Sequence, residues 1–160
     1  MQGWRKRQED SHIADLDLGP SNKTQVFGVF DGHGGCEVAK FVANHFTEEF
    51  LKNPNYLRND IKKALEENYQ KMDSLMLEKK GSEELLAEYQ KLKEEAAKIK
   101  ENNKNSQIEM LRQVIDPKEQ PDAKISMFTG CTANVLVIQD KKLFFAKGDF
   151  KNHMTILLIL

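Results

Sequence analysis

The 160-residue sequence contains few of the features that mark disulfide-rich, secreted or membrane proteins. Its two cysteines, Cys36 and Cys131, are too few for a disulfide framework and lack the spacing of a zinc site. No apolar run approaches the roughly 20 residues needed to cross a bilayer, and charges occupy the first ten residues, where a signal peptide would be apolar. We therefore expect a cytoplasmic or nuclear protein with reduced thiols and no membrane partner.

An excess of charge of either sign is also missing. The chain has 24 basic and 25 acidic residues and a formal net charge of -1, so its overall charge gives no reason to expect a nucleic-acid partner. A chain of this length is typical of one domain, which buries roughly 70% of the surface of its unfolded form. Any function is therefore expected to depend on a local site.

Strand patterns occur at both ends of the chain. Residues 11–18 alternate apolar and polar side chains, and Thr24–Asp31 is rich in β-branched and aromatic residues, so we expect two neighbouring strands. Residues 131–149 return to strand character, with a hairpin connection at 140–142. The final apolar stretch, TILLIL, is either another buried strand or a segment whose continuation is missing.

Two amphipathic helices are expected between these strands, over residues 37–51 and 59–79. Apolar residues recur there at helical spacing, which predicts that each helix lays one apolar stripe on the sheet. The two stripes are Val38, Phe41, Val42, Phe46 and Phe50, followed by Ile61, Leu65, Tyr69, Met72 and Met76. Strands, two helices and further strands together predict an α+β layer protein.

The segment from Lys80 to Lys124 differs from the rest because it is dense in Glu, Lys and Ala. Its apolar residues, at Leu85, Tyr89, Leu92, Ala96 and Ile99, are spaced alternately four and three apart. This heptad-like pattern lasts about two heptads, whereas a coiled coil ordinarily needs at least ~3–4. A charged surface helix or a flexible insertion is therefore favoured over a coiled coil.

The stretch VFGVFDGHGG, Val26–Gly35, is the strongest candidate for chemistry. Asp31 ends a predicted buried strand, so its carboxylate would be held on a rigid element at the edge of the sheet. The surrounding glycines let the backbone bend sharply and approach a ligand. An isolated Asp-Gly pair, however, is most often only a turn, with His33 a surface residue.

Two further carboxylates, Glu9 and Asp10, favour the functional interpretation. If the first two strands pair, these residues arrive near Asp31, and gathered carboxylates repel one another unless cations intervene. Carboxylate, carbonyl and water ligands suit Mg²⁺ or Mn²⁺, and two such ions roughly 3.5–4 Å apart can aim a shared hydroxide at phosphorus. Arg5 would then offer a planar fork for phosphate oxygens, so the constellation indicates phosphate-ester hydrolysis.

Three separated segments resemble, in order, motifs of the metal-dependent protein serine/threonine phosphatases of the type 2C, or PPM, family. The segments are MQGWRKRQEDSHIADLDL, FGVFDGHGGCEVAKFVANHF and GCTANVLVIQDKKLFFAKGD. The resemblance covers Met1 to about Leu51 and Gly130 to Asp149. It implies a β-sandwich flanked by helices, which hydrolyses phosphoserine and phosphothreonine in phosphoprotein substrates by means of a metal-activated water.

The resemblance also implies a metal site for two Mg²⁺ or Mn²⁺ ions. Asp31 is similar to the family's aspartate that bridges both ions, and Gly32 to the glycine that lends one of them its backbone carbonyl. Glu9 and Asp10 are similar to the family's acidic pair, of which one member holds a metal through water and the other supports the site.

Two catalytic roles follow from the same resemblance. Arg5 is similar to the family's phosphate-binding arginine. His33 is similar to the histidine proposed as general acid to the departing serine or threonine oxygen.

The sequence departs from the family after Gly148-Asp149, where Ser-Arg would usually follow and Phe150 stands instead. The family's later Asp-Gly and Asp-Asn motifs, whose aspartates complete the metal sites, are also missing. We therefore expect residues 1–160 to form a single partial domain with a charged helical insertion at about 80–124. A truncated product, an error of reading frame near 147–151 or a degenerate copy would each account for this.

Two hypotheses follow for the function. The first is a monomeric phosphatase of the type 2C class, with the activity of this chain alone left open. The alternative is a catalytically silent interaction module, in which the heptad-like seam at 82–100 docks a partner helix.

Overall fold

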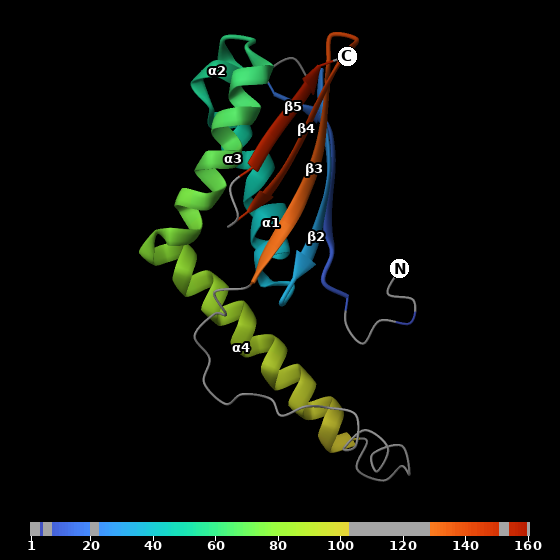
Figure 1. Cartoon of the computed structure of the whole chain (residues 1–160), viewed down its shortest axis with the longest axis vertical. Helices are drawn as coiled ribbons and strands as arrows, with labels where there is room; N and C mark the ends of the chain where they lie inside the picture. Colours follow the sequence, from blue (N-terminus) through green and yellow to red (C-terminus); the bar gives the residue numbers. More distant parts are fainter. Residues whose placement is uncertain (1–3, 5–7, 20–22, 103–128, 151–153, 160) are drawn as a thin grey trace.

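The computed structural model describes residue 4 and residues 8–19, 23–102, 129–150 and 154–159. Within these residues two strands are followed by four helices and then three strands, which confirms the α+β class (Figure 1). All five strands form one antiparallel sheet, in which each strand pairs with its neighbours along the chain. They are β1 (Ser11–Leu18), β2 (Thr24–His33), β3 (Gly130–Gln139), β4 (Lys142–Phe150) and β5 (Met154–Ile159).

The sequence predicted a hairpin connection at 140–142 and offered a final strand as one interpretation of the apolar end of the chain. The turn between β3 and β4 has positive φ at Asp140 (49°) and Lys141 (64°), as expected for a two-residue hairpin whose twist matches its strands. The apolar end of the chain forms β5, which pairs with β4, so the predicted strand is present, while the burial of its side chains lies outside what the structure describes.

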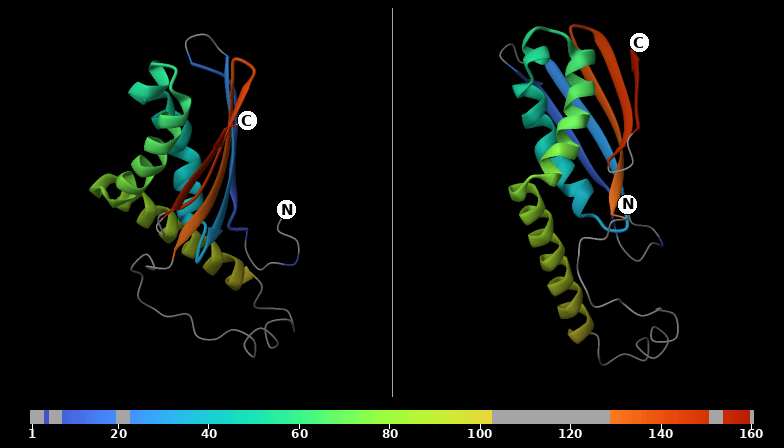
Figure 2. Two further views of the ribbon diagram at one scale, coloured as in Figure 1. Left: turned by 45° about the horizontal axis from the view of Figure 1, so that its top comes forward. Right: turned by 60° about the vertical axis from the view of Figure 1, so that its left-hand side comes forward.

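Helices α1 (Glu37–Lys52) and α3 (Ile61–Leu77) cover one face of the sheet (Figure 2). All ten residues of the two predicted apolar stripes are buried. At their centre, the Phe46 ring lies 6.0 Å from that of Phe30 on β2 and 5.6 Å, edge-on, from that of Tyr69. The Tyr69 hydroxyl is hydrogen-bonded to the carbonyls of Ala133 and Ala146, which ties α3 to two strands.

A short helix that the sequence analysis did not anticipate, α2 (Pro54–Leu57), joins α1 to α3. The Asn53 side chain caps it by accepting a hydrogen bond from the backbone N–H of Asn55 at 2.8 Å. Proline is well suited to its first turn because the missing N–H has no partner there in any case. Four residues are too few to show a helical period, so the element leaves no pattern in the sequence.

Helix α4 (Lys79–Asn102) begins on the body of the domain and then projects away from it (Figure 1). Leu85 is buried in the core, and two side-chain contacts hold this first part to α1: an ion pair between Lys40 and Glu88 at 2.5 Å and a hydrogen bond between His45 Nε2 and Glu84 Oε1 at 2.9 Å. The predicted seam is therefore used partly by the domain itself. The Ala96 and Ile99 side chains and residues 103–124 of the predicted insertion lie outside the described residues.

None of the helices described is both long enough and apolar enough to span a membrane.

The sheet has a second face, which we call the open face because no described helix packs on it (Figure 2). Side chains alternate between the two faces along each strand, so the neighbours of buried residues point to the open face. Val29 and Phe145 on this face are 55% and 37% exposed. The described residues thus provide one sheet of the expected sandwich and its helical cover.

Candidate active site

Three side chains form a row across one end of the sheet. Thr132 on β3 pairs with Asp31 on β2 and with Asp149 on β4, so the three residues lie side by side on adjacent strands. Their neighbours Phe30 and Phe150 are buried toward the helices, and strand alternation therefore turns the three side chains to the open face. We call Asp31, Thr132 and Asp149 the acidic row.

Asp149 is the second aspartate of this row, and the sequence analysis gave it no role in the site. Its side-chain oxygen Oδ1 is shielded from solvent and has no hydrogen-bond partner, a state that buried polar atoms rarely keep without a reason. Strands are spaced about 4.8 Å apart, so the Cα atoms of Asp31 and Asp149 lie roughly 10 Å from each other. Only the register of β2, β3 and β4 relates the two aspartates, and no local sequence pattern carries that information.

The backbone of Glu9 runs directly against Gly32, beside the acidic row. A Cβ atom at Gly32 would lie 2.3 Å from the Glu9 carbonyl oxygen and 2.9 Å from that of Gly35. Only glycine permits this approach, which brings the chain ahead of β1 to the end of β2. Asp31 and Gly32 lie within β2, which continues to His33, and the predicted convergence of Glu9 with them is present at the level of the backbone.

The other predicted site residues differ in how much the structure says of them. Asp10 is exposed, and its Oδ2 accepts a hydrogen bond from Gln8 Nε2 at 3.0 Å. Arg5 lies outside the described residues.

His33 ends β2 and packs over β3. It pairs with Gly130, and a Cβ atom there would lie 2.6 Å from His33 Nε2, so this glycine makes room for the imidazole. The Thr129 hydroxyl donates to the carbonyl of Gly34 at 3.4 Å, which closes the loop that follows the histidine. His33 is half buried and lies next to the acidic row.

These groups suit a hard divalent cation by type but do not complete a binding site. Carboxylates of Asp31 and Asp149 and backbone carbonyls at Glu9 and Gly32 are oxygen donors of the kind that Mg²⁺ and Mn²⁺ prefer. Among the residues that the structure describes, however, no three His, Cys, Asp or Glu side chains cluster closely enough to hold a metal ion. Within this group of residues, the unpartnered oxygen Oδ1 of Asp149 is the atom that calls for a cation or another donor.

Cys131 lies beside the acidic row on the opposite face and is fully buried. Burial, followed by the charges of Asp149, Asp73 and Asp31, raises the pKa of its thiol to about 12. The thiol therefore stays protonated at neutral pH, which excludes a thiolate nucleophile and agrees with the interpretation of Cys131 as a small buried strand residue.

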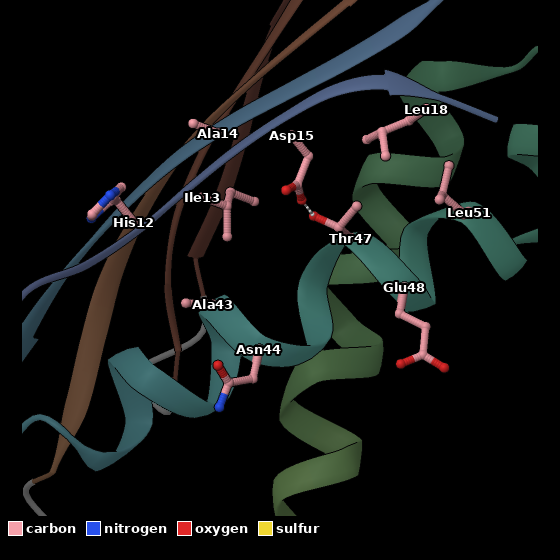
Figure 3. Close-up of a pocket in the computed structure, with 10 residues that line it drawn as sticks. All are labelled: His12, Ile13, Ala14, Asp15, Leu18, Ala43, Asn44, Thr47, Glu48 and Leu51. Carbon is pink, nitrogen blue, oxygen red and sulfur yellow. Dashed lines mark hydrogen bonds between the residues drawn. The ribbon is translucent and has the colours of Figure 1, made fainter. Parts of the chain in front are cut away.

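A shallow groove of about 750 Å³ lies elsewhere, along the edge between β1 and α1 (Figure 3). Its walls include His12 and Asp15 from the strand and Thr47 from the helix, whose hydroxyl donates to Asp15 Oδ2 at 2.5 Å. None of the predicted site residues lines it. The groove is therefore separate from the candidate site.

The sequence of this chain is similar to a family model and to several known proteins. The family model described as "Protein phosphatase 2C" matches residues 1–86. "Probable protein phosphatase 2C 6" from Paramecium tetraurelia is 38% identical over 155 residues, covering 96% of this chain and 41% of its own length. "Probable protein phosphatase 2C 21" from Arabidopsis thaliana is 38% identical over 154 residues, covering 93% of this chain and 43% of its own.

A solved structure, the serine-threonine phosphatase 2C from Toxoplasma gondii, resembles the fold with a TM-score of 0.54 at 13% identity. The match covers 98% of this chain and 45% of that one. This chain thus spans about two fifths of the length of the curated relatives that it matches along most of its own length.

Proposed function

Because the chain belongs to the protein phosphatase 2C family, we propose that its acidic row and the adjoining turns form part of a site for metal-dependent hydrolysis of phosphoserine and phosphothreonine in proteins. The observation that carries the proposal is the alignment of Asp31 and Asp149 across Thr132, with one Asp149 oxygen buried and unpartnered. Two carboxylates held on rigid strands favour a cation because their charges otherwise repel each other.

In this proposal Asp31, Asp149 and the carbonyl of Gly32 hold Mg²⁺ or Mn²⁺, with Glu9 and Asp10 supporting the site from the preceding segment. A bound divalent ion supplies an activated water and neutralises charge on the phosphoryl oxygens. Gly32 supports this arrangement because the absence of a side chain lets the Glu9 carbonyl approach the end of β2.

His33 and Arg5 serve the phosphoryl group in the same proposal. The His33 imidazole, held over Gly130, would deliver a proton to the departing serine or threonine oxygen. Arg5 would bind the phosphate oxygens through its planar guanidinium. A phosphorylated side chain would therefore enter from the end of the sheet at which β2 finishes and β3 starts.

The test is a calorimetric titration of the 160-residue chain with Mn²⁺, paired with hydrolysis of p-nitrophenyl phosphate and of a phosphoserine peptide. Asp31→Asn and Asp149→Asn each remove one proposed ligand and should weaken Mn²⁺ binding at least about tenfold. Asp140→Asn is the matched control, because it removes the same charge from the turn at the far end of the sheet. Equal Mn²⁺ affinity in all four proteins would refute the proposed metal site.

A catalytically silent interaction module is the second candidate. Two observations favour it: the described residues hold no three-ligand metal cluster, and the half-buried Tyr89 and Leu92 continue the Leu85 seam along the projecting part of α4. A chain that binds no Mn²⁺ and hydrolyses neither substrate would support this alternative. Variants of this seam are best placed beyond Glu88, because Leu85, Glu84 and Glu88 stabilise the domain itself.

A further inference from the structure

The groove between β1 and α1 has the size of a ligand site and lies away from the candidate active site (Figure 3). Its volume of about 750 Å³ is within the range of such sites, roughly 300–1,000 Å³. Both walls belong to residues 1–86, which match the family model. The groove is on the helix side of β1, so a second sheet packed on the open face would lie on the other side of this strand.

Three pairs of facing side chains, one from each wall, line the groove. The pairs, in order along it, are Ile13 with Ala43, Asp15 with Thr47, and Leu18 with Leu51 (Figure 3). The three residues of α1 are four positions apart and therefore share one side of the helix. The outer two pairs are apolar, whereas in the central pair the Thr47 hydroxyl donates to Asp15 Oδ2 at 2.5 Å.

The centre of the groove is acidic. Asp15 is half buried there, and Glu48 lies on the α1 wall, where Lys52 pairs with it at 2.6 Å. Of the ten residues that line the groove in the described part of the chain, none is Lys or Arg, and His12 is exposed. A matching ligand therefore carries a cation near Asp15 and apolar groups on both sides of it.

The wall formed by β1 also offers main-chain groups. Among the described strands β1 pairs with β2 alone, so the N–H and C=O groups on its outer edge have no strand partner there. Its regular part, Ser11–Asp15, contains neither proline nor lysine, two residues that commonly protect such an edge. Extended peptides bind edges of this kind by adding a strand, and their alternate side chains enter neighbouring pockets.

We propose that the groove binds an extended segment of a partner protein, which adds a strand to the outer edge of β1. Alternate residues of this segment face the groove in the order apolar, basic, apolar. The basic side chain pairs with Asp15, and each apolar side chain packs on one of the two apolar pairs. The pattern apolar-x-basic-x-apolar reads the same in both directions of the chain, so either strand direction satisfies it.

The lengths of the two walls agree with such a ligand. Ala43 and Leu51 are eight residues apart on a helix, a distance of about 12 Å. Ile13 and Leu18 pair with residues of β2 that are four apart, because the register shifts between them, so they span about 13 Å. The two apolar residues of the ligand are also four apart in a strand, and they therefore span the same distance of about 13 Å.

A synthetic peptide, Ser-Val-Thr-Arg-Thr-Val-Ser with blocked ends, tests the proposal through the fluorescence anisotropy of a labelled form. The expected result is saturable binding of one peptide to each 160-residue chain. Glutamate in place of the arginine sets a like charge against Asp15 and should weaken binding about tenfold or more. Hydrogen exchange should slow at alternate backbone amides of Ser11–Asp15, because the added strand pairs with the outer edge.

A double-mutant cycle identifies the ion pair. Asp15→Asn removes the charge but keeps a side-chain oxygen that accepts from the Thr47 hydroxyl. Glutamine in place of the peptide arginine should cost about tenfold in affinity for the wild type and less than about twofold for Asp15→Asn. A merely structural role of Asp15 would not produce this coupling. Glu94→Gln, at an exposed position of α4, is the matched control and should behave like the wild type.

A second variant tests the apolar part of the groove. Ala43→Phe fills the space beside Ile13 and should weaken peptide binding about tenfold or more. Ala87→Phe makes the same change at an exposed position of α4 and should leave the affinity unchanged. Circular dichroism confirms that both variants are folded, and the cycle at Asp15 decides the question independently if Ala43→Phe is not.

Three results would overturn the proposal: no saturable binding at peptide concentrations on the order of 1 mM, equal affinity for the arginine and glutamate peptides, or slowed exchange at strands other than β1. A second copy of the chain is the other possible occupant of this edge. A dimer in sedimentation equilibrium that Ala43→Phe dissociates would assign the groove to that copy and overturn the proposal as well.

Discussion

Replacing Gly32 by alanine tests whether the approach of Glu9 to the end of β2 holds the candidate site together. The added Cβ would lie 2.3 Å from the Glu9 carbonyl oxygen, whereas ordinary contacts of a Cβ atom begin at 3.4 Å. Relief therefore requires the Glu9 backbone or β2 to move by about 1 Å, because a backbone oxygen cannot rotate away as a side chain can.

Overpacking of this kind costs about 1–3 kcal/mol of the free energy of unfolding. For a chain of this size 1 kcal/mol corresponds to about 2–4 °C, so we expect Gly32→Ala to lower the melting temperature by about 2–12 °C. The displacement moves Glu9 away from the acidic row, and Mn²⁺ binding should weaken at the same time.

Gly28→Ala on the same strand is the matched control. A Cβ there would lie 2.9 Å from side-chain atoms of Ile13 and Phe30, which can shift without moving the chain ahead of β1. This variant should lose stability but retain the Mn²⁺ affinity of the wild type. Thermal melting and calorimetry measure both quantities, and a Gly32→Ala protein that melts and binds Mn²⁺ like the wild type would refute the reasoning.

Three further predictions concern the core. Phe46→Ala should lower the free energy of unfolding by about 3–5 kcal/mol in urea titrations, because the ring is fully buried between sheet and helices. Tyr69→Phe removes the hydroxyl bonded to the Ala133 and Ala146 carbonyls and should cost about 0.5–1.5 kcal/mol. Burial raises the pKa of the Cys131 thiol from 9.0 to about 12. The stability that the protonated thiol contributes is therefore complete below pH 9 and is lost as the pH rises toward 12. Cys131→Ala should flatten this alkaline decline in melting temperature.

The secondary structure followed closely from local pattern. Every apolar residue predicted to face the sheet from α1 and α3 is buried, because helical spacing puts such residues on one side whatever they pack against. The turn at Asp140 and Lys141 was likewise visible between two apolar runs. The short helix α2 was missed because one turn of helix has no measurable period.

The candidate site was predictable only in part. Asp31, Gly32 and His33 are consecutive in the sequence, so they lie close together whatever fold the chain adopts. The approach of Glu9 was inferred from the expected pairing of β1 with β2, and the contact with Gly32 agrees with it. Asp149 could not be assigned from the residues around it, because its relation to Asp31 passes through Thr132 on a third strand.

The amino-acid sequence by itself determined where strands and helices form and which side of each is apolar, since these properties depend on residues a few positions apart. Only the tertiary structure decided that two aspartates from distant segments share one row and that an apolar sheet face stands open beside them. Both follow from strand register, and a shift of one residue would turn every side chain of a strand to the other face.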